Sequence, residues 1–339
     1  MDRKAFSFLI VGLALGVLLT TAAFAWYVHN GRLNSAVQHS RVLKLAHGLD
    51  ENHPVHHGME HMAERVAELS GGRLAIQIFP NEQLGNETEC IEQLQRGALA
   101  MTKVSVAPLE SFTPKLSVFG MPFLFRDDAH HWKVLEGPIG RELLLASEEN
   151  GVRGLCYYDA GSRSFYTAKR PILTPDDLKG MKIRVQQSKT AMDMVEVLGG
   201  SPTPIAFGEL YTALQQGMVD GAENNVPSFH STRHYEVCKH LSLDRHTQVP
   251  DILLISTQVW ENLTPEEQQW LQQAADDSSR YQRGLWAEET EKALAAVKEH
   301  GVTVYEPDRQ PFIERAEAMH RRYDGTELGD MMQRIEEVR

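Results

Sequence analysis

Strand patterns and helix patterns alternate along most of this 339-residue chain, and this alternation limits the possible folds more than any other feature. Apolar residues recur at spacings of three and four from Val55 to Leu69, which is typical of an amphipathic helix, and an apolar strand pattern follows at 74–79. Such a succession is typical of βαβ units with a mainly parallel sheet. The sequence therefore predicts an α/β fold.

The same alternation continues toward the C-terminus. Further strands are expected at 100–106, 152–158, 182–185, 218–222, 251–257 and 302–305. Further helices are expected near 90–97 and at 127–135, 139–149, 190–198, 207–216, 228–240 and 263–300.

These elements group into two lobes. We expect lobe I at 42–160, lobe II at 161–249, and a last part at 250–339 that returns one strand to lobe I and adds C-terminal helices. Two α/β lobes joined by more than one crossing are typical of hinged proteins that close around a small molecule.

Composition excludes several classes of partner and scaffold. Lys and Arg number 34 and Asp and Glu number 46, so the formal net charge is −12, which argues against binding to nucleic-acid phosphates. Cys90, Cys156 and Cys238 lie far apart and form no CxxC pair, which argues against a disulfide scaffold or a cysteine-rich zinc module. We expect three buried thiols.

The N-terminus has the pattern of an export segment. A basic start precedes a long apolar stretch that ends at Ala25 in an A-x-A pattern, and Trp26 follows. The length of the stretch and the aromatic residue after it also fit an uncleaved membrane anchor, so both interpretations of 1–25 stay open. Residues 26–41 are interpreted as a tether, and the remainder is expected in the periplasm.

Histidine pairs were tested as metal sites. His57 and His61 match the H-x-x-E-H spacing of inverted zinc peptidases. Both are expected on the solvent side of their helix, opposite Met59, whereas a catalytic zinc ion needs a walled cavity. An exported zinc hydrolase is therefore kept only as an alternative, and no metal site or catalytic residue is predicted. His130 and His131 are interpreted as surface residues at a helix start.

Three polar residues of lobe II stand out instead. Arg184 lies within an apolar strand, where an unpaired charge is costly to bury, so it is expected to meet an anion. A guanidinium binds one carboxylate through two parallel hydrogen bonds. Arg163 is expected on a turn between the lobes, and Asn224 after a short strand.

At these residues the sequence resembles a known family. The segments KGMKIRV at 179–185, GSPTPIAFGELY at 200–211 and ALQQGMVDGAEN at 213–224 occur in order, after FPNEQLG at 79–85 and MPF at 121–123. Together they resemble the solute-binding proteins of tripartite ATP-independent periplasmic (TRAP) transporters, the DctP family. The resemblance extends from Val42 to about Phe312.

The resemblance implies a two-lobed periplasmic-binding-protein fold that traps an organic acid and delivers it to TRAP membrane permease subunits, with no enzymatic activity and no cofactor. It implies that Arg184 clamps the ligand carboxylate, that Arg163 and Asn224 assist, and that Phe207 packs on the ligand. On lobe I it implies cleft-facing positions at His47, Glu87, Lys103 and Ser105. A monomer is expected.

The polar wall of the expected cleft suits a carboxylate that carries several hydroxyls. The segments 157–166 and 223–225 resemble the family members that take sugar acids, which favours a hexuronate such as glucuronate or galacturonate. A C4-dicarboxylate stays open as the alternative, because Lys103 offers a second cation. A ligand sensor for a membrane receptor is a further alternative to transport.

Overall fold

The structure is a computed structural model that describes residues 20–21 and 40–339. Apart from Thr20 and Thr21, the expected export signal or anchor lies outside the described residues, as does the expected tether up to residue 39. None of the helices in the described residues has the length and apolar character that crossing a membrane requires. The body at 42–339 is one compact unit, separate from 1–41, and is described by itself.

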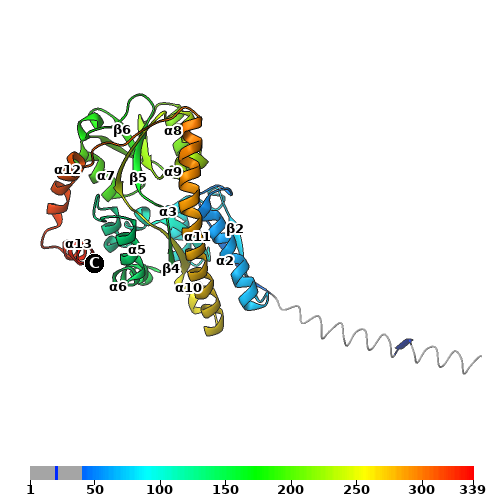
Figure 1. Ribbon diagram of the computed structural model, residues 1–339. Coiled ribbons are helices and arrows are strands. Elements are labelled where there is room, and N and C mark those ends of the chain that lie inside the picture. Colours follow the sequence, from blue (N-terminus) through cyan, green and yellow to red (C-terminus); the bar gives the residue numbers. More distant parts are fainter. Residues whose placement is uncertain (1–19, 22–39) are drawn as a thin grey trace, which may run out of the picture. The chain divides into compact units, whose positions relative to one another are not determined.

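Two β-sheets form the framework of this body (Figure 1). The first sheet has the order β2-β1-β3-β10-β4 and the second the order β11-β9-β5-β8-β6-β7. The strands of the first sheet are β1 (Arg41–Ala46), β2 (Leu74–Phe79), β3 (Met101–Ser105), β4 (Val152–Tyr158) and β10 (Asp251–Ser256). Those of the second are β5 (Arg163–Thr167), β6 (Lys182–Val185), β7 (Ser201–Pro204), β8 (Gly221–Asn224), β9 (His240–Thr247) and β11 (Thr303–Tyr305).

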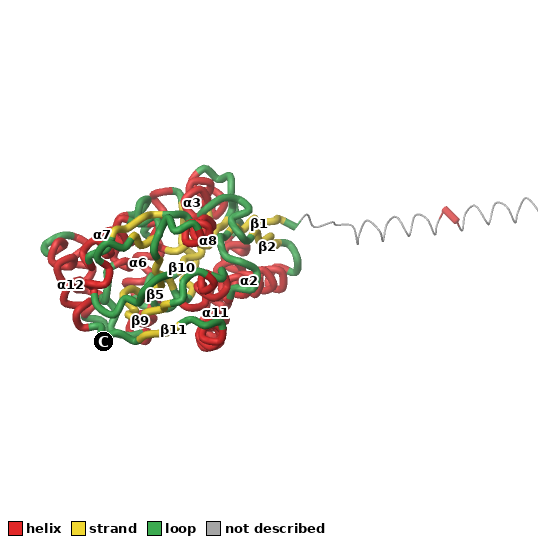
Figure 2. Tube along the Cα trace, turned by 90° about the horizontal axis from the view of Figure 1, so that it is seen from above, coloured by secondary structure: helices red, strands yellow, loops and turns green. Residues whose placement is uncertain are grey.

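Helices cover both sheets. They are α2 (Pro54–Ser70), α3 (Glu87–Gln95), α4 (Val106–Leu109), α5 (Asp128–Glu136), α6 (Pro138–Leu145), α7 (Lys189–Leu198), α8 (Leu210–Gln215), α9 (Val226–Ser231), α10 (Thr257–Glu261), α11 (Pro265–Glu299), α12 (Gln310–His320) and α13 (Glu327–Glu336). Figures 1 and 2 both show α12 beside α7, against which it packs.

Both sheets are mixed. The pairs β1–β3, β6–β7 and β6–β8 are parallel, as the βαβ patterns predict. Strand β10 is antiparallel to both of its neighbours, and so is β5. The predicted return of the 251–257 strand to the first sheet is confirmed, because β10 lies between β3 and β4.

Three connections join the two sheets, of which two are short and the third runs from β10 through α10 and α11 to β11. Strand β4 leads into β5, and β9 leads into β10, while β4 pairs with β10 and β5 pairs with β9. The two connections at 159–162 and 248–250 therefore run between the same two pairs of strands. This arrangement is that of a hinge.

The long helix α11 packs on elements of both sheets (Figure 1). It contacts α2 and β4 beside the first sheet and α9 beside the second. Thr264 caps its start, where Glu267 completes a capping box. Its contact with α2 is close at Gly58, where a Cβ atom would lie 2.7 Å from Cβ of Gln282.

One predicted helix is wrong. The pattern at 228–240 is divided between α9, a 3-10 turn at His234–Glu236 and the start of β9. Leu241 and Leu243 alternate with polar residues and are buried, so β9 follows the period of a strand rather than that of a helix. The strand lies inside the second sheet, between β5 and β11.

Two other expectations concern burial. The three cysteines are buried free thiols, as predicted. His130 and His131 are buried as well, so their interpretation as surface residues is wrong. His130 Nε2 lies 3.0 Å from the carbonyl oxygen of Ile335, and His131 packs edge-on to Phe125.

Candidate functional site: a closed cleft between the sheets

A small cavity of about 40 Å³ lies between the two sheets. Its polar lining, rather than its size, marks it as the candidate site. Its polar wall contains Glu87, Lys103, Ser105, Arg163, Gln186, Asn224, Asn225, Ser228 and Asp251, and Phe207 is among its apolar residues. A second hollow, which Arg184 lines, shares Glu87, Gln186 and Phe207 with this cavity.

Arg184 is the one strongly buried cation in the described residues whose guanidinium keeps an N–H group unpaired. It lies on β6, between β7 and β8, and its side chain is 2% exposed. Nε and Nη2 both donate to the carbonyl oxygen of Ile205, at 2.9 and 2.8 Å, while Nη1 is buried without a hydrogen-bond partner. Burial lowers the pKa of Arg184. Within the described residues no carboxylate pairs with Arg184, which leaves the guanidinium ready for an external acceptor.

Arg163, by contrast, already has its counter-ion. It is the first residue of β5 rather than part of a turn, so that detail of the prediction is wrong. Nε and Nη2 lie 2.5 and 2.9 Å from the two carboxylate oxygens of Glu223, and Nη1 donates to Asn224 Oδ1 at 2.9 Å. Burial by itself raises the pKa of Glu223, but the charge of Arg163 lowers it to about 2.

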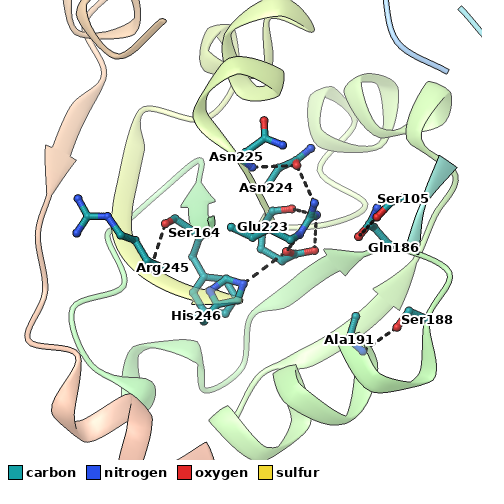
Figure 3. Close-up of polar contacts among 12 residues, drawn as sticks. Ser105, Ser164, Gln186, Ser188, Ala191, Glu223, Asn224, Asn225, Arg245 and His246 are labelled. Atoms are coloured by element: carbon teal, nitrogen blue, oxygen red, sulfur yellow. Dashed lines mark hydrogen bonds and ion pairs between the residues drawn. The ribbon is translucent and has the colours of Figure 1, made fainter. Parts of the chain in front are cut away.

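A buried histidine extends this pair, as Figure 3 shows. His246 Nδ1 lies 2.7 Å from Asp244 Oδ2, and its Nε2 lies 3.5 Å from Glu223 Oε2. Burial by itself lowers the pKa of His246, but the two carboxylates raise it to about 9. The side chains of Arg163, Glu223, His246 and Asp244 then form a row of alternating charges that carries no net charge. The sequence analysis did not predict this row.

Asn224 is placed at the end of β8, beside Asn225 (Figure 3). Its Oδ1 atom accepts from Arg163 and from the backbone N–H of Asn225 at 2.9 Å. Its Nδ2 group makes no hydrogen bond within the described residues and is available to a ligand oxygen. The pairing of Asn224 opposite Ser164 in the sheet fixes this position.

The wall from the first sheet is organised around Lys103. Its Nζ atom lies 3.0 Å from Asp251 Oδ2 and 3.8 Å from Glu87 Oε1. Glu87 Oε1 also accepts from the backbone N–H of Ser105 at 2.7 Å. Burial raises the pKa of both carboxyl groups. Lys103 is therefore shared between two acids and is not a free second cation.

Asp251 was not among the predicted site residues, although the sequence contained a signal for it. It is the first residue of β10 and pairs opposite Ser105, two residues from Lys103. The return of this strand to the first sheet was predicted, and an antiparallel neighbour of β3 brings its first residue to the end of β3.

His47 does not line the cavity. Its Nε2 atom lies 2.9 Å from His56 Nδ1, and its Nδ1 accepts from the backbone N–H of Leu49 at 3.1 Å. Burial lowers its pKa to about 2, so it is neutral. Gly48 and Leu49, the next two residues, line the cavity instead. The side chain of His47 holds the backbone of the wall.

Contacts between the two lobes close the cleft. Ser105 Oγ lies 3.4 Å from Gln186 Oε1 (Figure 3), and Thr88 Oγ1 donates to Gln187 Oε1 at 3.0 Å. On another side His53 Nε2 lies 3.2 Å from Ser228 Oγ. The structure is that of the closed form.

The zinc alternative finds no support in the described residues, where no group of three or more His, Cys, Asp or Glu residues is placed to hold a metal ion. His57 binds Glu60 at 2.9 Å and has a side chain that is 44% exposed. His61 stacks on Tyr281 instead of facing His57.

Comparison with known families identifies the chain. The family model described as bacterial extracellular solute-binding protein, family 7 (DctP), matches residues 45–326. The chain belongs to this family. As a member of the DctP family it is a solute-binding protein rather than an enzyme, which replaces the alternative of a zinc hydrolase.

Solved structures agree in fold. A TRAP periplasmic solute-binding protein from Bradyrhizobium sp. BTAi1, in complex with α/β-D-galacturonate, is 41% identical, with a TM-score of 0.85 over 87% of this chain and 99% of that one. One from Anaerococcus prevotii, with bound α/β-D-glucuronate, is 35% identical, with a TM-score of 0.86 over 88% and 98%. The two-lobed TRAP fold is confirmed.

A relative that is named for a different ligand is also similar. The C4-dicarboxylate-binding periplasmic protein DctP of Rhodobacter capsulatus is 33% identical over 265 residues, which are 78% of this chain and 79% of that protein. Family membership alone therefore does not choose between sugar acids and dicarboxylates.

Proposed function

We propose that this protein captures a hexuronate such as D-galacturonate or D-glucuronate and delivers it to a TRAP membrane permease. The unpaired, buried Nη1 group of Arg184 carries this proposal. A carboxylate that accepts from this group supplies the missing hydrogen bond and the missing counter-charge together. The two similar TRAP proteins with bound uronates support the choice of ligand.

The charges of the cleft favour an acid with a single carboxylate. Arg163 is paired with Glu223, and Lys103 lies between Asp251 and Glu87. A second carboxylate of a C4-dicarboxylate would meet two acids around one ammonium. The hydroxyls of a sugar acid, in contrast, donate to these carboxylates and accept from the ammonium.

The individual roles follow from these contacts. In the proposal, Arg184 clamps the carboxylate, Phe207 packs on the ligand, and Asn224 donates through Nδ2. Arg163 has one N–H left for the ligand, because Glu223 and Asn224 take the others. Glu87, Lys103 and Ser105 meet the hydroxyls. His47 acts only through the wall that it supports.

Capture has no chemical step. Ligand contacts with both lobes exist together only when the cleft is shut, so the ligand stabilises the closed form by its differential affinity. The lobes proposed are 42–160 with the returning strand β10, and 161–249. We further propose that the protein is monomeric and works in the periplasm, after export by a segment at 1–25 that is cleaved or kept as an anchor.

Calorimetry with the purified protein tests this function. D-galacturonate and D-glucuronate are compared with succinate and with D-galactarate, which carries a carboxylate at each end. The proposal expects micromolar or tighter binding of at least one hexuronate, about −8 kcal/mol, and at least tenfold weaker binding of both dicarboxylates. Tighter binding of succinate than of either uronate would replace the proposal with the dicarboxylate alternative.

A further inference from the structure

A strained turn follows strand β2. Asn81 and Glu82 are successive non-glycine residues with positive φ, at 55° and 56°. The left-handed region is costly for residues with a side chain, and it is retained where the surroundings fix it. Here the N–H of Glu82 donates to the carbonyl oxygen of His47 at 3.1 Å. The N–H of Gly85 donates to the carbonyl oxygen of Glu82 at 2.9 Å.

The turn directs the Glu82 side chain between two glycines. A Cβ atom on Gly48, in the first lobe, would lie 3.3 Å from Cγ of Glu82. A Cβ atom on Gly208, in the second lobe, would lie 2.4 Å from its Oε2. The carboxylate accepts from the backbone N–H of Gly208 at 3.1 Å. Only a residue without a side chain at Gly208 permits this approach.

This contact lies at the clamp. Glu82, Arg184 and Phe207 line the same hollow, and Phe207 immediately precedes Gly208. The guanidinium carbon of Arg184 is 5.9 Å from the centre of the Phe207 ring. A bond to the N–H of Gly208 therefore fixes the segment that carries the aromatic residue facing the clamp.

We propose that Glu82 is a positioning residue that latches the cleft in its closed form through the N–H of Gly208. The proposal rests on the solute-binding function proposed above. The hydrogen bond joins the two lobes, so it is present in the closed form and absent from the open form that the ligand enters. Its loss is expected to speed release of the ligand and to leave capture unchanged.

The experiment follows opening and closing directly in the full protein. Cysteines introduced at the exposed residues Gln77 and Lys182, one in each lobe, carry a donor and an acceptor dye, since the three native thiols are buried. Energy transfer then reports the closed fraction, and stopped-flow mixing with D-galacturonate gives the association and dissociation rates. Far-ultraviolet circular dichroism and thermal unfolding establish that each variant is folded.

Glu82→Ala is expected to raise the dissociation rate about tenfold, which corresponds to about 1.4 kcal/mol, with an unchanged association rate. Glu82→Gln keeps an oxygen acceptor and is expected to restore most of the difference. Glu92→Ala is the matched control, because it removes an exposed carboxylate of the same lobe that pairs with Arg96. It is expected to match the wild type.

A double variant separates the latch from a general loss of stability. Gly208→Ala alone is expected to raise the dissociation rate, because the new Cβ meets the carboxylate. In the Glu82→Ala background the same change meets no carboxylate, so the double variant is expected to release ligand no faster than Glu82→Ala alone. The latch would be overturned if the two substitutions raised the dissociation rate additively in the double variant. It would also be overturned if Glu82→Ala released the ligand at the same rate as the wild type.

The ligand-free protein provides a readout that does not depend on the ligand. The latch predicts a smaller closed fraction for Glu82→Ala than for the wild type without any solute. Failure of the wild type to bind any uronate would refute the proposed function and leave this comparison intact. Equal closed fractions of the two ligand-free proteins would refute the latch.

Discussion

Arg184 and Ile205 share a forked contact in which Nε and Nη2 both donate to one carbonyl oxygen, at 2.9 and 2.8 Å. The contact holds the plane of the guanidinium without neutralising its charge, and it leaves Nη1 unpaired. A buried cation fixed in orientation by a neutral acceptor is a costly arrangement in the absence of a ligand. Its cost is removed when a carboxylate enters, which is the physical basis of the proposed affinity for acids.

Selectivity against dicarboxylates is the first prediction. In wild-type protein, D-galactarate is expected to bind at least tenfold more weakly than D-galacturonate, because its second carboxylate approaches Glu87 and Asp251. Glu87→Gln removes one of these charges and is expected to bring the affinities for the two ligands closer together. Calorimetry with both ligands measures the ratio of the affinities, with Glu92→Gln as the control. An unchanged ratio in Glu87→Gln would remove Glu87 from the selectivity of the cleft.

Stability at alkaline pH is expected to depend on His246. Asp244 and Glu223 raise its pKa from 6.5 to about 9, so the folded state holds a proton that the unfolded state has released. This contribution is complete below pH 6.5 and is lost as the pH rises through about 9. The free energy of unfolding should therefore fall by up to about 1.4 kcal/mol per pH unit in this window. Urea unfolding measures it, and His246→Gln is expected to flatten the slope, whereas equal slopes would contradict the charged state of His246.

Stability at acidic pH is expected to depend on His131, with the opposite sign. Burial lowers the pKa of this histidine from 6.5 to about 3, so the folded state holds it neutral. Its contribution to the free energy of unfolding is therefore complete above pH 6.5 and is lost as the pH falls toward 3. Its Nε2 is buried and has no hydrogen-bond partner among the described residues, and its ring packs against Phe125. His131→Phe is expected to unfold at higher urea than the wild type at pH 5, with a smaller difference at pH 7. A difference that does not change with pH would show that the ring is not held neutral.

Local patterns in the sequence predicted the elements that have a clear period and a clear end. Strand β6 was recognisable because KIRV alternates, and its arginine was conspicuous because an apolar strand rarely contains a cation. Strand β9 was missed, because its two buried leucines are a short signal and no glycine or proline separates it from α9.

The network behind the clamp depends on pairing between distant strands. Arg163, Glu223 and His246 belong to β5, β8 and β9, which become neighbours only through the antiparallel register of the second sheet. No local pattern contains that register, so the sequence could not name Glu223 as the partner of Arg163. The family resemblance named Arg163 without revealing that Glu223 neutralises it.

The affinity of Arg184→Lys for D-galacturonate tests the central claim most directly. Lysine keeps the positive charge but cannot hold the forked contact with Ile205 and present a further N–H group to the ligand. Calorimetry beside the wild type is expected to show at least tenfold weaker binding, a loss of about 1.4 kcal/mol or more, with the thermal midpoint of the ligand-free protein close to that of the wild type. Equal affinity of the two proteins would contradict the assignment of Arg184 as the group that holds the acid.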